Sequence, residues 1–145
     1  MSNELIDAPW MHEACRLLGV TETPGKRATP AIIRLWRALG KLWVSSDEVP
    51  WCAVFVGSCL RRAGYTGTGR ANARSYLRYG VPVITPKYGD ICVFSRGNSP
   101  WQGHVGFFLR QEGDWLWILG GNQRNQVCAK RYPARRLLGS RRPVR

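Results

Sequence analysis

Residues 50–64 of this 145-residue chain read PWCAVFVGSCLRRAG, and they predict a helix with one buried face. Apolar or small side chains recur there at the i, i+3, i+4, i+7, i+8, i+11 spacing of a single helix face, at Cys52, Phe55, Val56, Cys59, Leu60 and Ala63. Two acidic residues precede Pro50, which is typical of a helix start, and Gly64 closes the pattern. A cysteine therefore lies in the first turn of the best-defined helix.

Helices precede strands along the rest of the chain. Shorter helical patterns cover residues 9–18 and 30–39, and a weaker one covers 71–79. Runs rich in Val, Ile, Phe and Trp follow, separated by Gly, Asn, Asp and Pro, at residues 90–94, 104–109, 115–119 and 126–131. This order predicts an α+β domain whose N-terminal helices pack on a C-terminal antiparallel sheet. No repeat or linker divides the chain, so residues 1–145 are expected to form a single domain.

The positive charge of the chain is confined to its second part. The net charge is +13; residues 1–50 are neutral overall, and residues 51–145 carry sixteen basic and three acidic side chains. Such a field favours a polyanionic partner, either nucleic acid or an anionic envelope surface. No apolar run is long enough to span a bilayer, and the N-terminus lacks the pattern of a signal peptide. We expect a monomer made in a cytoplasm.

The five cysteines, Cys15, Cys52, Cys59, Cys92 and Cys128, predict neither a disulfide framework nor a zinc site. Their number is odd, and no CxxC pair occurs. Two distant histidines and scattered carboxylates provide no metal-ligand spacing, so no metal or cofactor is expected. Three or four of the thiols are expected to fill the core.

Cys52 is the candidate nucleophile. Free backbone N–H groups and the helix dipole at a helix start favour a thiolate and can also bind a developing oxyanion, so the thiol pKa is expected to be lowered. From position alone, a buried core thiol is the alternative interpretation.

His104 and Asn122 are the candidate partners of Cys52. His104 opens a predicted strand in the setting WQGHVGFFL, whereas His12 lies in a segment without other chemical features. Asn122 ends the next strand, in LGGNQ, and the start of one antiparallel strand lies beside the end of the next. An amide oxygen there can orient the imidazole, with Gln123 as the substitute, although Gly-Gly-Asn is also an ordinary turn sequence. Asp90 is expected to be a turn or cap residue.

The order of these motifs resembles the CHAP family (cysteine, histidine-dependent amidohydrolase/peptidase) and the related NlpC-type peptidases. The matching segments are Pro9-Trp10, GVTETPG at 19–25, PWC at 50–52, YGDICVFSRG at 88–97, GHVG at 103–106 and LGGNQ at 119–123. Some CHAP enzymes carry a Glu shortly before the strand-end Asn, where this chain has Gly120, which favours Asn122 as the orienting residue. The resemblance covers about residues 9–143 and implies a papain-like fold.

The resemblance implies a cysteine hydrolase that cleaves an amide bond of bacterial peptidoglycan without a cofactor. Catalysis is expected from Cys52, His104 and Asn122, with the backbone of Trp51 and Cys52 at the oxyanion. Substrate binding is expected from Trp101, Gly103 and Gln123.

Three biological roles are compatible with this chemistry and charge. A bare catalytic domain fits a phage endolysin that reaches the periplasm or cell wall after release, with the basic C-terminal half, including Arg135, Arg136, Arg141 and Arg142, attracting it to the envelope. An antibacterial effector amidase is the alternative. A non-enzymatic nucleic-acid-binding protein is a third hypothesis, which the absence of a recognised nucleic-acid motif disfavours.

Overall fold

The computed structural model describes residues 8–20, 51–123 and 126–145. The helix expected at 30–39 lies outside these residues.

Two of the predicted helices are present and one takes a tighter form. α1 (Trp10–Arg16) and α3 (Cys52–Arg62) confirm the first and the best-defined helices. The weaker pattern at 71–79 forms the 3-10 helix η1 (Ala73–Arg78). None of the helices in the described ranges is long and apolar enough to cross a bilayer.

The strands form one six-stranded sheet in the order β1-β6-β2-β3-β4-β5, with antiparallel neighbours throughout. Its members are β1 (Val81–Pro82), β2 (Ile91–Ser95), β3 (Gly103–Glu112), β4 (Trp115–Gln123), β5 (Gln126–Pro133) and β6 (Leu137–Arg142). All four predicted strands are confirmed. β1 and β6 were not predicted, because VP is too short and LLGSRR too basic to show a strand pattern. The fold is α+β, as expected.

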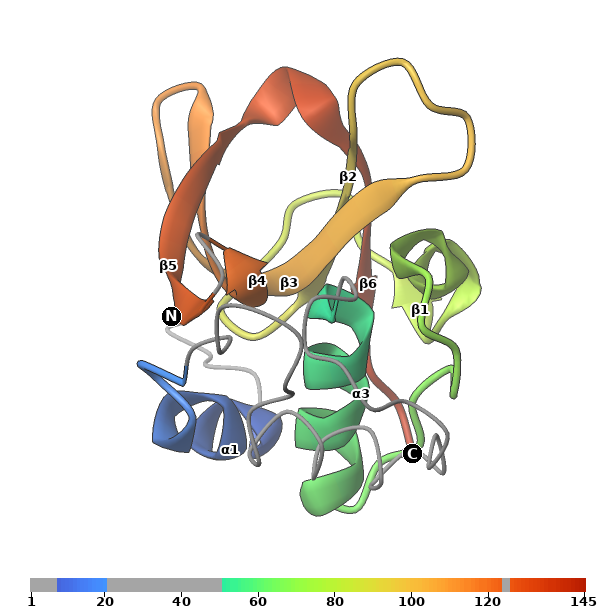
Figure 1. Ribbon diagram of the computed structural model, residues 1–145, viewed down its shortest axis with the longest axis vertical. Helices are drawn as coiled ribbons and strands as arrows, with labels where there is room; N and C mark the ends of the chain where they lie inside the picture. The colour runs from blue at the N-terminus through green and yellow to red at the C-terminus, as the bar shows by residue number, and fades with distance from the viewer. Residues whose placement is uncertain (1–7, 21–50, 124–125) are drawn as a thin grey trace, which may run out of the picture.

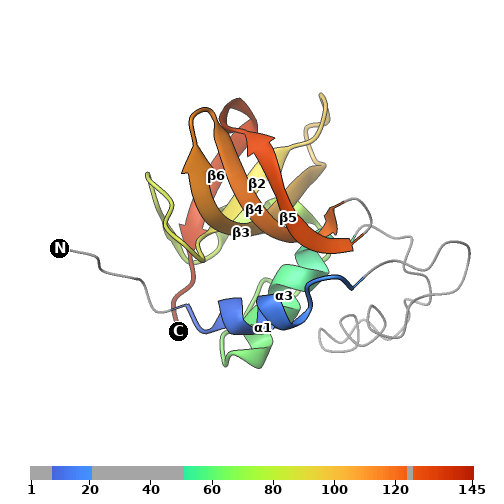
Figure 2. The same ribbon diagram turned by 90° about the vertical axis from the view of Figure 1, so that its left-hand side faces the viewer.

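The sheet curves over the helices, and α3 lies beneath it beside α1 (Figures 1 and 2). α3 contacts α1, β3 and β4, and every residue from Cys52 to Leu60 is buried. The helix is thus enclosed on all sides from Cys52 to Leu60, whereas the spacing of its larger apolar residues predicted only one buried face. Phe55 packs edge-on against Phe107 of β3, with ring centroids 6.0 Å apart. This packing fixes the N-terminus of α3 against the middle of the sheet.

A buried ion pair attaches β6 to the start of β2. Arg142 donates from Nε and Nη2 to the two carboxylate oxygens of Asp90, at 2.8 and 2.7 Å. Asp90 is fully buried and also accepts a hydrogen bond from the Lys87 backbone N–H at 2.7 Å. The predicted turn role of Asp90 is confirmed. Because removal of one partner of a buried pair leaves an uncompensated charge, Arg142 has a structural role and is not simply a surface cation.

Candidate active site

Cys52 is the first residue of α3, and Trp51 occupies the position before it. Burial raises the pKa of the Cys52 thiol, while the backbone N–H groups of Val105 and Ala53 and the charge of Arg96 act in the opposite direction. The helix start therefore has the expected effect on the sulfur, but the net shift is opposite in sign to the expected one. Burial raises the pKa by more than the N–H groups at the helix start lower it, and this burial arises only when the helix packs in the folded protein. The thiol is protonated at neutral pH.

His104 lies at the start of β3 directly before Val105, the residue whose backbone N–H favours the Cys52 thiolate. Its ring is buried and stacks on Tyr132 of β5, with centroids 4.9 Å apart. His104 Nε2 lies 2.8 Å from Oε1 of Gln123 at the end of β4. The predicted meeting of the β3 start with the β4 end is confirmed.

The hydrogen bonds of Gln123 determine which ring nitrogen of His104 carries the proton. The amide nitrogen of Gln123 donates to the carbonyl oxygens of Ile118, at 3.2 Å, and Cys128, at 2.6 Å. Its Oε1 is therefore the acceptor, and His104 Nε2 must be the donor. In a neutral imidazole this leaves Nδ1 unprotonated, so Nδ1 is the basic atom of His104.

Burial lowers the pKa of His104 from 6.5 to about 4, and the charges of Lys130, Arg96 and Arg136 act in the same direction, against the Gln123 hydrogen bond. Both groups of the candidate pair are thus neutral at pH 7. The imidazole is available as a base without first losing a proton.

The lowered pKa of His104 predicts that the protein loses stability as the pH falls from 6.5 toward 4. In that range the unfolded chain binds a proton that the folded chain does not, so the free energy of unfolding decreases by at most about 1.4 kcal/mol per pH unit. Summed over the interval, the loss is on the order of 3 kcal/mol. Denaturant unfolding of wild type and His104→Gln across this range measures it. Equal slopes in the two proteins would contradict the shift.

Two glycines of LGGNQ permit close packing, Gly120 beside His104 and Gly121 beside Trp51. A Cβ added at Gly120 would lie 2.5 Å from Gln123 Oε1 and 3.3 Å from His104 Nε2. A Cβ added at Gly121 would lie 2.5 Å from the Trp51 ring. Both glycines therefore make room for neighbouring side chains of the protein itself.

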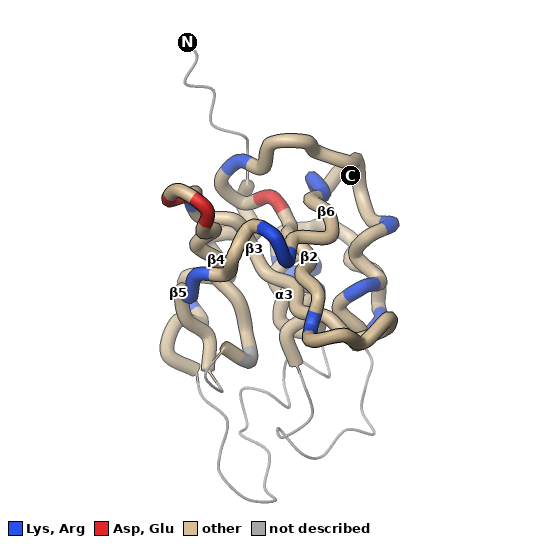
Figure 3. The backbone as a smooth tube through the Cα atoms, turned by 90° about the horizontal axis from the view of Figure 1, so that it is seen from above, with Lys and Arg blue, Asp and Glu red and all other residues tan. Residues whose placement is uncertain are grey.

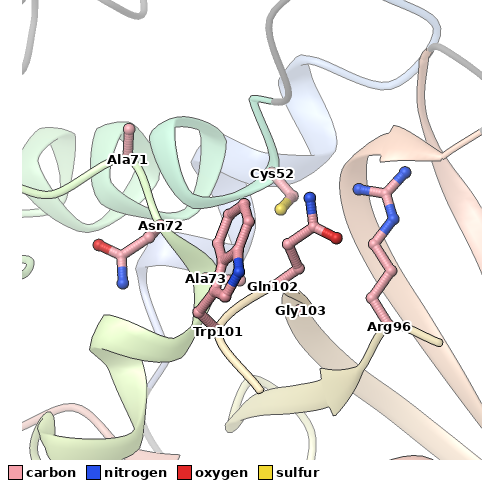
Figure 4. A pocket seen from close by; sticks show the side chains of 8 residues that line it. All are labelled: Cys52, Ala71, Asn72, Ala73, Arg96, Trp101, Gln102 and Gly103. Atoms are coloured by element: carbon pink, nitrogen blue, oxygen red, sulfur yellow. The ribbon is translucent and has the colours of Figure 1, made fainter. Parts of the chain in front are cut away.

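A cavity of about 250 Å³ opens beside Cys52, and Figure 4 shows the thiol between the Asn72 side and the Arg96 side of it. Its lining is Cys52, Ala71, Asn72, Ala73, Arg96, Trp101, Gln102 and Gly103. Trp101 is 67% exposed and Gly103 opens β3, so two of the three predicted substrate-binding residues are located here. The third, Gln123, lies buried against His104.

A second cavity of about 140 Å³ lies on the His104 side. It is lined by Arg96, His104, Lys130, Tyr132 and Arg136, and we call it the cationic cavity. Arg96 lines both cavities, so the two adjoin at this residue.

The family model of the CHAP domain matches residues 44–122, which is more than half of the chain and includes Cys52, His104 and Asn122. This chain belongs to the CHAP family. No curated protein matches the sequence.

Solved structures with the same fold include two NlpC/P60 proteins. One, an NlpC/P60 family protein from Bacillus cereus ATCC 10987, has a TM-score of 0.55 and 15% identity over 92% of this chain and 39% of its own. The other, a protein from Staphylococcus aureus subsp. aureus Mu50 described as similar to a lipoprotein of the NLP/P60 family, has a TM-score of 0.54 and 18% identity over 94% of this chain and 41% of its own. The CHAP chain thus spans about two fifths of each relative and shares the papain-like fold.

The CHAP motifs do not include every residue of this site. Lys130, Tyr132 and Arg136 follow the end of the family match, and Arg96 lies inside it, in the matching segment at 88–97, but the sequence analysis gave it no role. Lys130 and Tyr132 are two residues apart in β5 and therefore share a face of the sheet. This spacing could have shown from the sequence that the two side chains lie together. The side chain of Asn122 lies outside the described residues, and its predicted role stays a prediction.

Proposed function

We propose that this chain hydrolyses an amide bond of bacterial peptidoglycan, with Cys52 as nucleophile and His104 as general base. The observation that carries the proposal is the position of Cys52 at the start of α3, beside the Val105 N–H, with the adjacent His104 held through Nε2 by Gln123. A thiol, a base and an orienting amide are the three parts of a Cys-His acyl-transfer site.

In the proposed reaction, His104 Nδ1 removes the thiol proton as Cys52 Sγ bonds to the amide carbonyl carbon. The carbonyl electron pair moves to oxygen, and backbone N–H groups at the start of α3, those of Trp51 and Cys52, stabilise the oxyanion. The tetrahedral carbon then expels the amine, which receives the proton from His104, and a thioester remains. His104 next removes a proton from water, and attack by this water releases a carboxylic acid and restores the thiol.

Both resting groups are neutral in this account, since burial raises the pKa of Cys52 and lowers that of His104. The proton therefore moves during the attack of sulfur rather than before it. A buried neutral pair avoids the desolvation cost of a thiolate–imidazolium pair in the free enzyme.

The fragments released from purified Gram-negative peptidoglycan test this proposal. Mass spectrometry is expected to find one new amine and one new carboxyl group for each cut, and their position names the bond. Products that carry only new reducing sugar ends, or no products at all, would contradict an amide hydrolase.

We also propose that Gln123 positions His104. Gln123→Ala removes the acceptor of the Nε2 proton, and the expected result is a decrease in kcat of about 10- to 100-fold with little change in KM, by analogy with other orienting groups. Asn122→Ala is the matched comparison one residue away, since Asn122 is the orienting residue that the sequence predicts; if Gln123 alone positions the ring, this variant keeps most of the activity. Steady-state kinetics on a soluble peptidoglycan fragment measures both. A large loss in Asn122→Ala with a small loss in Gln123→Ala would restore Asn122 as the orienting residue.

The biological role that we propose is that of a phage endolysin, with an antibacterial effector as the alternative. In the view of Figure 3, lysine and arginine positions are spread over the strands and over the neighbouring segments, and fewer acidic positions are visible. Arg142 and Arg136 are held by Asp90 and by the Ser95 carbonyl, so a test of envelope attraction should use an exposed cation such as Arg135. Replacing it should reduce lysis of whole cells more than hydrolysis of purified wall.

A further inference from the structure

The cationic cavity brings three basic side chains together from separate parts of the sheet. Arg96 follows β2, Lys130 lies in β5, and Arg136 ends the 3-10 helix η2 (Ala134–Arg136). Tyr132 forms their common support, with Lys130 Nζ 5.3 Å and Arg136 Cζ 5.6 Å from its ring centroid. Arg136 is further fixed by hydrogen bonds from Nε and Nη2 to the Ser95 carbonyl oxygen, at 3.1 and 2.6 Å.

Within residues 8–20, 51–123 and 126–145, no carboxylate pairs with these three cations. Glu13 pairs with Arg16, Asp90 with Arg142, and Glu112 with Arg110 and Arg131, while Asp114 lies in the β3–β4 turn. Like charges held together in a partly enclosed cavity repel one another, and a bound anion relieves this repulsion. The arrangement thus has the electrostatics of an anion site.

The cavity is also on a defined side of the reaction. His104 lines it, and His104 is the group that delivers a proton to the departing amine. The cavity beside Cys52 and Trp101 shares Arg96 with it but is not lined by His104. A volume of about 140 Å³ is below that of pockets for drug-sized ligands, roughly 300 Å³ and above, so it suits a small group such as a carboxylate.

We propose that the cationic cavity is a subsite for a carboxylate carried by the amine side of the scissile amide, bound by Lys130 and Arg96 with Arg136 behind them. This inference rests on the proposed function and extends it to substrate choice. It predicts a preference for stem-peptide bonds whose leaving amine belongs to a residue with a free α-carboxylate. The carboxylate is recognised most strongly through charge-assisted hydrogen bonds from the cationic side chains.

The test compares two synthetic stem-peptide fragments that differ only at the residue supplying the leaving amine, as the α-carboxylate or the α-carboxamide. Wild type is expected to hydrolyse the carboxylate form with a kcat/KM about tenfold higher or more, in line with one or two charge-assisted contacts. Lys130→Gln should reduce this preference to about threefold or less, mainly through KM with the carboxylate form. Lys87→Gln is the matched control, because it removes the same charge from an exposed position. Lys87 precedes the first residue of β2, whereas Arg96 of the cationic cavity follows the last.

The outcomes separate the subsite from the proposed function. If wild type cleaves both peptides equally, the subsite is wrong and the hydrolase stands. If it cleaves neither, the proposed function fails on these peptides, and calorimetry with Cys52→Ala decides the subsite alone. About tenfold tighter binding of the carboxylate peptide, lost in Cys52→Ala/Lys130→Gln, supports the subsite. Equal binding of the two peptides, or a preference that survives Lys130→Gln, overturns it.

Discussion

His104→Ala is expected to lower kcat/KM for peptidoglycan hydrolysis by about a thousandfold, within the range for loss of a general base. The expectation follows from the hydrogen bonds of Gln123, which place the ring proton on Nε2 and leave Nδ1 as the base. The raised pKa of Cys52 favours a protonated thiol in the free enzyme, so the attack of sulfur needs a base. In the proposed mechanism His104 is the group that removes this proton. Release of soluble fragments from purified wall measures the effect.

His12→Ala is the matched control, since His12 is exposed on α1 and belongs to neither cavity. It is expected to retain activity within about twofold, as for a surface substitution. Thermal unfolding at pH 7 establishes that His104→Ala is folded, because the ring it removes stacks on Tyr132. A folded His104→Ala protein with near-normal turnover would assign the base elsewhere.

Cys52→Ala is expected to abolish hydrolysis, with a loss of at least about a thousandfold, because the covalent intermediate cannot form. Cys59 offers a matched comparison in the same helix, two turns later. Burial raises the pKa of Cys59 as well, but Cys59 lines neither of the two cavities. Cys59→Ala should therefore reduce stability while leaving catalysis largely intact.

The sequence predicted the elements where their signal is local. Helix α3 follows from the spacing of Phe55, Val56 and Leu60, and β2 to β5 follow from apolar runs separated by turn residues. β6 has no such signal, because its charged residues make long-range contacts instead of forming an apolar pattern. Arg142, for example, pairs with Asp90, 52 positions away. A contact of that separation cannot be read from the segment alone.

The alternation of residues along the strand could not decide whether Asn122 or Gln123 orients the His104 ring. In a regular strand, alternate residues face one side, so one of two neighbours faces His104. The pairing of β4 with β5 shifts register between Gly120 and Gln123, so the regular alternation along β4 does not predict the orientation of Gln123. The structure places Gln123 against His104, the residue that the sequence had assigned to substrate and had named as a substitute orienter.

The sign of the Cys52 pKa shift is a third example. The local helix start predicted a lowered value, and its N–H groups do act that way, but burial under the sheet outweighs them. The cationic cavity is similar in origin, because Arg96, Lys130 and Arg136 meet only once the sheet has formed. The positions of the motif residues in helix α3 and strand β3 could be predicted from the sequence, while the pKa shift of Cys52 and the grouping of the three cations required the tertiary structure.

Hydrolysis of one preparation of purified Gram-negative peptidoglycan by wild type, Cys52→Ala and Cys59→Ala is the decisive test of Cys52 as the nucleophile. We expect wild type and Cys59→Ala to release fragments with matching new amine and carboxyl ends. Cys52→Ala, once a thermal unfolding transition has shown that it is folded, is expected to release none above the enzyme-free control. Fragments released by folded Cys52→Ala at the wild-type rate would contradict a Cys52 nucleophile.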